Sequence, residues 1–392
     1  MTFYKSPDVP KMFHMKKTCF ILLLSITILF SCKKDSDTQG DPPPATQEDI
    51  ATIDNAVQSF MNSHSIPGVS IAVTKAGKLV YAKSYGKMSN TDNTPVTNSS
   101  LYRIASVSKP ITSVGIMKMI EMNLLTMDSK VFGPGSILGE DYTTPAGMHD
   151  ITVRHLLHHT VGSWGNDGND PMFQHPTYSH SQLIEWTIAN YPATAGRGTY
   201  KYSNFGYCLL GRIIEKLSGK TYEQFIKDEV LAPSGISNMK LGGNTLADRL
   251  PNEVIYTGQG GFDPYVYNIT RMDAHGGWIG SATDLARFMV SVDGFNTKPD
   301  ILQTSTINTM ITPSVPASYY ASGWGVNNQN NWWHTGSLPG TAAEIVRAQN
   351  GFNWVILCNS RKYNNSFDTD LDNLLWPIVT NANTPWQNID QF

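Results

Sequence analysis

The sequence predicts an α+β fold, in which an antiparallel sheet built from N- and C-terminal strands is flanked by helices and carries a large, mostly helical insertion. Helical patterns and loops rich in Gly and Pro dominate the middle of the chain, from about 110 to 285. Strand patterns bounded by turn residues lie near both ends, at 69–74, 79–85, 323–326, 340–349 and 352–359. Strands from both ends are therefore expected to share one sheet.

Each predicted element has local signals. Ala76-Gly77 separates the first two strands, and Asn350-Gly351 separates the last two, as expected for tight hairpin turns. A helical pattern opens at Ser106 and tolerates Pro110 in its first turn. The remaining helical patterns lie at 47–60, 181–190, 206–217, 283–290 and 368–379.

Length and composition fit one exported domain. The 392 residues can bury a large core, and a single domain reaches this size by insertion. Charged residues make up 16% of the chain and aromatic residues 10%, which argues against global disorder. The net charge of −3 and the lack of a basic run argue against nucleic acid as a partner.

The N-terminal residues are typical of an export signal. Lys16 and Lys17 precede the apolar run 19–30, which is too short to span a bilayer and suits a signal-peptide core. Met15 is a possible start. The run ends in a Leu-x-Ser-Cys pattern that resembles a bacterial lipoprotein cleavage site, with Cys32 as the lipidated residue. Ordinary secretion is the alternative.

The residues after Cys32 are polar and contain three consecutive prolines, as expected for a stiff tether. They also resemble the export tags of surface lipoproteins in some diderm bacteria. Attached acyl chains would anchor the protein stably to a membrane. The predicted location is the cell envelope, on the outer membrane, facing the periplasm or the cell surface.

Three short motifs, taken in order, carry the chemistry. A hydroxyl and an amine three residues apart lie on one face of a helix, so the amine can take the proton that a serine loses before it attacks a carbonyl. A phenol and an amide two residues apart would supply a proton relay and a substrate clamp. The set is Ser106-x-x-Lys109, Tyr202-x-Asn204 and His334-Thr335-Gly336.

Position separates this serine from others with the same spacing. Ser-x-x-Lys also begins at Ser31, Ser84 and Ser237, which lie in the export signal, an alternating strand and a Pro/Gly-rich loop. Only Ser106 opens a helical pattern, where backbone N–H groups and the positive end of the helix dipole favour developing negative charge. The sequence therefore indicates a serine acyl-transfer enzyme.

These motifs resemble those of the penicillin-recognising serine hydrolases, a group of class C β-lactamases, D-alanyl-D-alanine carboxypeptidases and esterases. The resemblance covers roughly 50–377, and its segments are 104–109, 151–160, 202–211, 276–285 and 333–340. It implies a β-lactamase/transpeptidase-like fold. The predicted organisation is a signal peptide at 1–31, a lipidated tether at 32–47, a catalytic domain at 48–380 with a helical subdomain at about 110–285, and a C-terminal tail at 381–392.

The resemblance also implies roles for the site residues. Ser106 would hold the acyl group, and Lys109 and Tyr202 would share the base role, with the choice between them open. Either base needs a pKa shifted by several units to act near neutrality. The backbone N–H groups of Ser106 and Ser337 would form an oxyanion hole, which contributes roughly 3 kcal/mol per donor. The substrate-binding residues would be Asn204, His334, Thr335 and Gly336.

Two of these residues have more specific expectations. Gly336 would leave room for a substrate backbone beside its strand. His334 stands where class C β-lactamases have lysine, and a histidine is only partly charged near neutrality. His334 is therefore expected to titrate between pH 5.5 and 8, and efficient β-lactam hydrolysis is doubtful. A peptidase and an esterase remain open, with a small-molecule or peptide acyl substrate, no cofactor and no evident protein partner.

Two alternative functions accompany this prediction. The histidines His155, His158 and His159 suggest a metal-dependent hydrolase, although the spacing supplies no convincing further ligand. A surface-tethered binding protein of the same fold that has no catalytic turnover is the other alternative.

Cys208 and Cys358 are expected to be buried free thiols, with a disulfide as the alternative.

Overall fold

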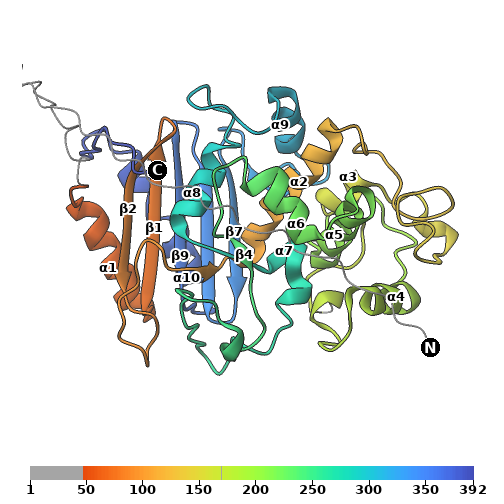
Figure 1. The fold of residues 1–392 in the computed structure, drawn as a ribbon, viewed down its shortest axis with the longest axis horizontal. Coiled ribbons are helices and arrows are strands. Elements are labelled where there is room, and N and C mark those ends of the chain that lie inside the picture. The colour runs from red at the N-terminus through yellow and green to blue at the C-terminus, as the bar shows by residue number, and fades with distance from the viewer. Residues whose placement is uncertain (1–46, 169) are drawn as a thin grey trace, which may run out of the picture. The chain divides into compact units, whose positions relative to one another are not determined.

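The computed structural model describes residues 47–168 and 170–392, and it confirms the predicted α+β architecture (Figure 1). The predictions for the signal peptide, Cys32 and most of the tether fall outside these residues. The main sheet has six antiparallel strands in the order β2-β1-β9-β8-β7-β6. Its strands are β1 (Gly68–Lys75), β2 (Lys78–Gly86), β6 (Gly325–Val326), β7 (Trp332–Leu338), β8 (Thr341–Arg347) and β9 (Phe352–Cys358).

Both ends of the chain meet in this sheet, as predicted, because β1 pairs with β9 along its length. The hairpin turns lie where the sequence places them. Ala76 and Gly77 have φ of 49° and 75°, and Gly351 has φ of 88°. In the first hairpin, left-handed backbone at both turn residues matches the twist of the strands that a two-residue turn joins.

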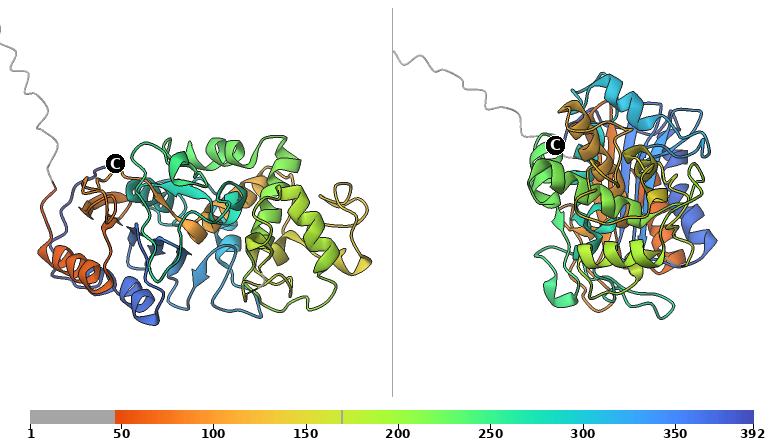
Figure 2. Two further views of the ribbon diagram at one scale, coloured as in Figure 1. Left: turned by 90° about the horizontal axis from the view of Figure 1, so that it is seen from below. Right: turned by 90° about the vertical axis from the view of Figure 1, so that its right-hand side faces the viewer.

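Helices cover both faces of the sheet (Figure 2). One face carries α1 (Ala51–His64), α10 (Asn365–Asp372) and α11 (Trp376–Val379), and side chains such as Ile71 and Phe367 share a core there. The other face packs against α2 (Ser108–Glu121) and α8 (Ala282–Val290). Cys208 and Cys358 are free and buried, one in each core, as predicted.

The closing helix predicted at 368–379 is two helices. Pro377 lies at the start of α11, where its missing N–H is tolerated, whereas in the middle of one continuous helix it would remove a hydrogen bond. The chain therefore turns between α10 and α11.

The helical insertion extends beyond the β7 side of the sheet. It carries a small sheet in the order β3-β5-β4, which the sequence did not predict because strands of two or three residues show no alternation. Its strands are β3 (Tyr102–Arg103), β4 (Lys240–Leu241) and β5 (Trp278–Gly280). The other α-helices are α3 (Val153–Leu157), α4 (His180–Asn190), α5 (Asn204–Ser218), α6 (Tyr222–Ile226), α7 (Asp273–Gly276) and α9 (Thr304–Ile311).

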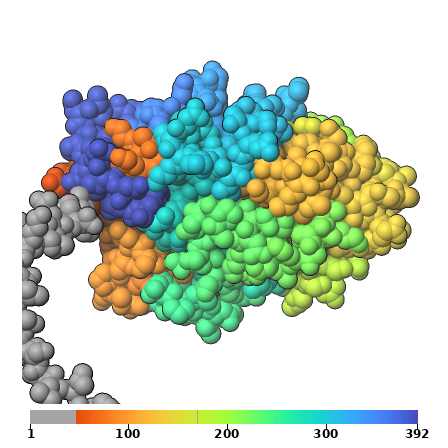
Figure 3. All heavy atoms as spheres, turned by 45° about the horizontal axis from the view of Figure 1, so that its top comes forward, coloured from red at the N-terminus to blue at the C-terminus, as the bar shows by residue number. Residues whose placement is uncertain are grey.

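The C-terminal residues lie against the first hairpin (Figure 3). The backbone N–H of Gln391 donates to the Leu79 carbonyl (3.1 Å), and the Leu79 N–H donates to Asp390 Oδ1 (3.1 Å). These bonds cover part of the exposed edge of β2, which would otherwise offer unpaired backbone groups. Within 47–168 and 170–392, no helix combines the length and apolar character needed to cross a bilayer.

Candidate active site

Ser106 lies in a short turn immediately before α2, at the edge of the main sheet. The turn is a 3-10 segment, Ala105–Val107, so the regular helix begins two residues later than the sequence predicts. Ala105 is buried with φ of 47°, a conformation that costs energy for a non-glycine residue and is often found at functional sites. The turn leaves Ser106 partly exposed between two buried neighbours.

Gly336 holds this turn against β7. A Cβ at Gly336 would lie 2.1 Å from the Ile104 carbonyl oxygen, which no real side chain tolerates. The space on the Cβ side of Gly336 is therefore filled by the turn of the protein itself, and the glycine permits the close approach of two protein segments. Room for a substrate backbone along the edge of the strand stays a prediction.

Lys109 lies one helical turn below the serine and is fully buried. Its Nζ donates to Ser106 Oγ (3.1 Å), Asn204 Oδ1 (2.7 Å) and the His275 carbonyl (2.9 Å). Three acceptors match the three N–H bonds of an ammonium. Burial lowers the pKa of Lys109 to about 7, and the charge of Asp170 opposes this shift. A substantial neutral fraction of this amine therefore exists near neutrality, as the base role requires.

Asp170 is a site residue that the sequence did not reveal. It is 3% exposed; its Oδ2 accepts from Asn204 Nδ2 (2.7 Å), and its Oδ1 accepts from the Met172 N–H (2.9 Å). Burial raises its pKa to about 6. A chain of hydrogen bonds thus runs from Asp170 through Asn204 and Lys109 to Ser106. Its position in an irregular loop gives no spacing signal that links it to the nucleophile.

Asn204 occupies a different place from the one expected of a substrate clamp. It is the first residue of α5 and is 4% exposed. Its amide oxygen accepts from Lys109, and its amide nitrogen donates to Asp170. The side chain therefore connects the amine to the carboxylate beneath the cleft and does not line the cleft.

Tyr202 borders the cleft on the other side of Ser106. Lys109 Nζ lies 4.7 Å from the centroid of its ring, within the range of a cation–π contact. Desolvation raises the pKa of Tyr202 above its ordinary value, and the Ser106 side chain partly offsets this. The phenol is therefore protonated at neutral pH.

His334 is buried under the cleft in a chain of fixed hydrogen bonds. The Ser203 N–H donates to His159 Nδ1 (3.0 Å), so His159 carries its proton on Nε2, 3.2 Å from Tyr320 Oη. Tyr320 Oη lies 3.2 Å from His334 Nε2, and His334 Nδ1 donates to the Thr335 carbonyl (2.7 Å). The Tyr320 hydroxyl therefore donates to His334 Nε2.

The expectation that His334 titrates near neutrality is wrong. Burial, and secondarily the positive charge of Lys109, lower its pKa to about 3. The imidazole is neutral throughout the physiological range. The sequence could not show this because the shift depends on burial and on residues distant in the chain.

The cleft above these residues has a volume of about 440 Å³. Ser106, Thr335 and Ser337 line one side, with Thr335 and Ser337 exposed on β7. Because β6 pairs with β7 only at Trp332 and Trp333, the 335–338 edge is not covered by β6. Aromatic rings line the rest: Tyr200, Tyr202, Tyr319, Tyr320 and Trp333.

The three histidines considered as metal ligands have separate partners. His155 Nδ1 accepts from the Thr152 N–H (3.1 Å), His158 Nε2 lies 3.0 Å from Ser322 Oγ, and His159 belongs to the Tyr320 chain. In the part of the chain that the structure describes, no three His, Cys, Asp or Glu side chains are grouped to hold a metal ion.

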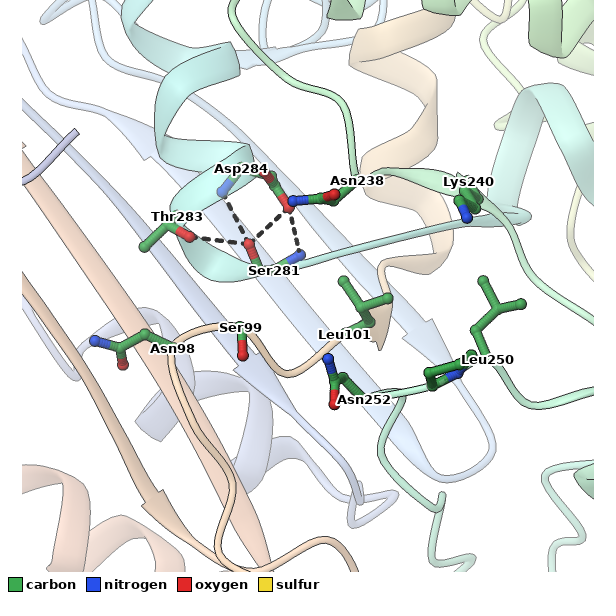
Figure 4. Close-up of a pocket in the computed structure, with 11 residues that line it drawn as sticks. Asn98, Ser99, Leu101, Asn238, Lys240, Leu250, Asn252, Ser281, Thr283 and Asp284 are labelled. Carbon is green, nitrogen blue, oxygen red and sulfur yellow. Dashed lines mark hydrogen bonds between the residues drawn. The ribbon is translucent and has the colours of Figure 1, made fainter.

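A second cleft, of about 500 Å³, lies between the 98–101 segment, β4 and the start of α8 (Figure 4). Its best-defined contacts are those of a helix cap, in which Ser281 Oγ donates to Asp284 Oδ2 (2.7 Å) and accepts from the Asp284 N–H (3.1 Å). None of the predicted site residues lines it, and its one hydroxyl–carboxylate pair, Ser281 and Asp284, forms the N-terminal cap of α8. The Ser106 cleft is therefore the candidate site.

Comparison with known proteins finds relatives of this chain. Penicillin-binding protein 4* of Bacillus subtilis (strain 168) is 30% identical over 220 residues, covering 54% of this chain and 44% of that protein. Protein flp of Staphylococcus aureus (strain MW2) is 24% identical over 333 residues, covering 80% of this chain and 64% of that protein. The chain thus spans about half to two thirds of the length of these curated relatives.

Solved structures share the fold at lower identity. An octameric penicillin-binding protein homologue from Pyrococcus abyssi has a TM-score of 0.68 at 24% identity, covering 83% of this chain and 76% of that chain. The D-amino acid amidase from Ochrobactrum anthropi SV3, complexed with L-phenylalanine, has a TM-score of 0.68 at 20% identity, covering 82% and 97%.

The family assignment rests on most of the chain. A sequence model of the family described as Beta-lactamase matches residues 53–375, from α1 to the segment before α11. This range contains the Ser106 turn, the Tyr202 loop and strand β7. The chain therefore belongs to the beta-lactamase family.

Proposed function

We propose that this protein is a serine hydrolase that cleaves amide or ester substrates through a covalent acyl-enzyme on Ser106. The observation that carries the proposal is the 3.1 Å contact between Lys109 Nζ and Ser106 Oγ, made by an amine whose pKa is about 7. A nucleophile within hydrogen-bond reach of a base that is partly neutral at working pH is the arrangement that covalent acyl transfer needs.

Lys109 is assigned as the base for acylation. Its neutral amine takes the Ser106 proton while Oγ bonds to the substrate carbonyl carbon. Tyr202 keeps its proton at neutral pH, and we assign it to pass a proton to the leaving amine or alkoxide, which Lys109 then replaces. In the second half of the cycle water attacks the ester, the same groups accept its proton, and Ser106 Oγ leaves protonated.

The negative oxygen of each tetrahedral intermediate needs donors that are already in place. Ser106 and Ser337 face the same cleft from the nucleophile turn and from the part of β7 that β6 leaves uncovered. We assign their backbone N–H groups to this role, where one donor contributes roughly 3 kcal/mol. The named relatives, penicillin-binding proteins and a D-amino acid amidase, support acyl chemistry on amides.

Active-site labelling tests this function. A fluorophosphonate probe is expected to add covalently to Ser106, and peptide mapping by mass spectrometry locates the adduct. Ser106→Ala should lose all labelling, whereas Ser99→Ala, which changes an exposed serine, should keep it. A folded wild-type protein that takes no label and turns over no ester would instead be a binding protein. Activity that a chelator abolishes would favour the metal-dependent alternative.

The cellular location is a separate proposal, made from the sequence alone. We propose that Cys32 is the lipidated residue that holds the protein on the outer membrane, facing the periplasm or the cell surface. Mass spectrometry of the mature N-terminal peptide should show a lipid-modified Cys32, and Cys32→Ser should release the protein from the membrane fraction. An unmodified N-terminus in soluble protein would mean ordinary secretion.

A further inference from the structure

The lining of the Ser106 cleft holds no ionisable Lys, Arg, Asp or Glu side chain among the described residues. Its side chains are hydroxyls, an amide, one neutral imidazole and five aromatic rings. Lys109 lies below the floor, where three acceptors hold its amine. The chemistry of this surface therefore suits uncharged groups.

Charged residues near the rim compensate each other. Lys201 precedes Tyr202 in the chain, and its Nζ lies 3.9 Å from Asp167 Oδ2. Their side chains are 44% and 66% exposed, so water and salt screen both charges. This pair offers a substrate anion little net attraction.

His334 lines the cleft but supplies no positive charge, because burial and the nearby Lys109 amine lower its pKa. Its Nε2 accepts from the Tyr320 hydroxyl, and its Nδ1–H is held by the Thr335 carbonyl. A proton on Nε2 would turn this acceptor into a second donor facing Tyr320. It would also place a positive charge near Lys109, which already disfavours it.

We propose that the enzyme selects acyl substrates whose leaving-group side carries no carboxylate, namely peptide amides and esters with an aromatic or apolar group. This inference rests on the proposed function of the same site. A carboxylate bound here would lose water without gaining a cation, which disfavours its binding. The aromatic rings instead provide large apolar contact surfaces. Tyr320 is the positioning residue, because its hydroxyl donates to His334 Nε2 and occupies the position where a second proton would bind.

A matched pair of substrates tests the selectivity. N-acetyl-D-alanyl-D-alanine and its C-terminal amide differ only in the terminal charge. We expect the wild-type kcat/KM to be at least tenfold higher for the amide. An equal or higher value for the free acid would overturn the proposal. Reaction with p-nitrophenyl butyrate and labelling of Ser106 are measured on the same sample, and their absence would remove the proposed function instead.

Variants that add a cation test the cause. His334→Lys places an ammonium under the cleft, and Thr335→Lys places one at an exposed position of β7, which the fold tolerates more easily. Either change should raise the acid-to-amide ratio of kcat/KM at least fivefold. If both variants fold and leave the ratio unchanged, charge at this position does not set specificity and the proposal fails.

Tyr320→Phe tests the positioning role. Without the hydroxyl, His334 Nε2 loses its donor and is freer to take a proton, so the acid-to-amide ratio should increase as the pH falls from 7 to 5. Tyr319→Phe removes a hydroxyl from the same cleft without touching His334, and its ratio should follow the wild type. Identical ratios in the two variants across this range would contradict the role of Tyr320.

Discussion

Two buried aspartates, Asp170 and Asp273, bond to side chains of helix α5, and their pKa values are shifted in opposite directions. At the first residue of this helix, Asn204 connects Asp170 to Lys109, and Asp170 also accepts from the Met172 N–H. About two turns along, Arg212 Nη2 lies 2.6 Å from Asp273 Oδ2, and His180 Nε2 lies 3.4 Å from Asp273 Oδ1.

The partners decide the charge of each aspartate. Burial disfavours the charged form of both side chains. For Asp273 the Arg212 guanidinium outweighs burial and lowers the pKa of the carboxyl below its ordinary range. For Asp170 the donors are neutral and the amine is one residue removed, so burial prevails and the pKa rises to about 6. The Asp273 network therefore stabilises the fold. The Asp170 network instead keeps the pKa values of Asp170 and Lys109, near Ser106, at about 6 and 7.

Replacing Lys109 should have the largest effect on activity. Lys109→Met keeps the length and removes the base, so kcat/KM should fall by about 10²–10⁴-fold. The free energy of unfolding should stay the same or increase, because a desolvated amine is replaced by an apolar side chain. Ester hydrolysis and urea unfolding of the same preparation measure both quantities. A fall in activity that only accompanies a loss of folded protein would show that Lys109 is structural.

Removing the charge of Asp273 should lower the stability of the fold and leave the activity of the folded protein nearly unchanged. Asp273→Asn leaves the Arg212 guanidinium buried without its counter-charge, which should cost about 3–5 kcal/mol of unfolding free energy. The fraction that remains folded should keep a kcat within severalfold of wild type, because Asp273 does not line the cleft. Urea unfolding and active-site titration check this. A fully stable variant with a large loss in kcat would reverse the comparison.

The two aspartates also respond oppositely to pH. The pKa of Asp170 is higher in the folded than in the unfolded chain, so stability falls as the pH rises from about 4 to 6 and is level above that range. The change is about 3 kcal/mol. Asp273 has a lowered pKa, so its contribution is present above about pH 4 and is lost on further acidification.

Asp170→Asn isolates the first of these effects. The unfolding free energy of the variant minus that of the wild type should rise by about 3 kcal/mol between pH 4 and 7. Asp167→Asn changes a carboxylate of the same loop that is 66% exposed, and its difference should stay flat. A flat difference for both variants would mean that Asp170 is not desolvated in the fold.

The sequence could predict the parts of this site that depend on local geometry. The contact between Ser106 and Lys109 follows from a three-residue spacing at a helix start, and both hairpins follow from their turn residues. The proximity of Ser337 to Ser106 came only from the resemblance, because residues more than two hundred positions apart meet through the whole sheet. In the sequence, only the order of the three motifs along the chain indicates that they belong to one site.

The remaining features depend on tertiary surroundings that no local pattern encodes. Asp170 and Tyr320 lie in irregular loops, and their roles arise from hydrogen bonds to residues far away in the chain. The charge state of His334 was predicted wrongly for the same reason, since burial and the neighbouring amine determine it. The contact of Gly336 with the Ile104 carbonyl is also absent from any local pattern, because it joins two segments far apart in the chain.

The smallest expected effect is a change in the pH dependence of the rate. If neutral Lys109 is the base, kcat/KM for an uncharged ester should fall below a pH of about 7, the pKa of this amine. The charge of Asp170 raises that pKa, so Asp170→Asn should move the acidic limb to lower pH, by up to about one pH unit. The exposed control Asp167→Asn should leave the limb in place. An acidic limb of Asp170→Asn that lies at higher pH than that of the wild type, or coincides with it, would contradict this effect of Asp170 on the Lys109 pKa. The two aspartates would then differ only in how they affect the stability of the fold.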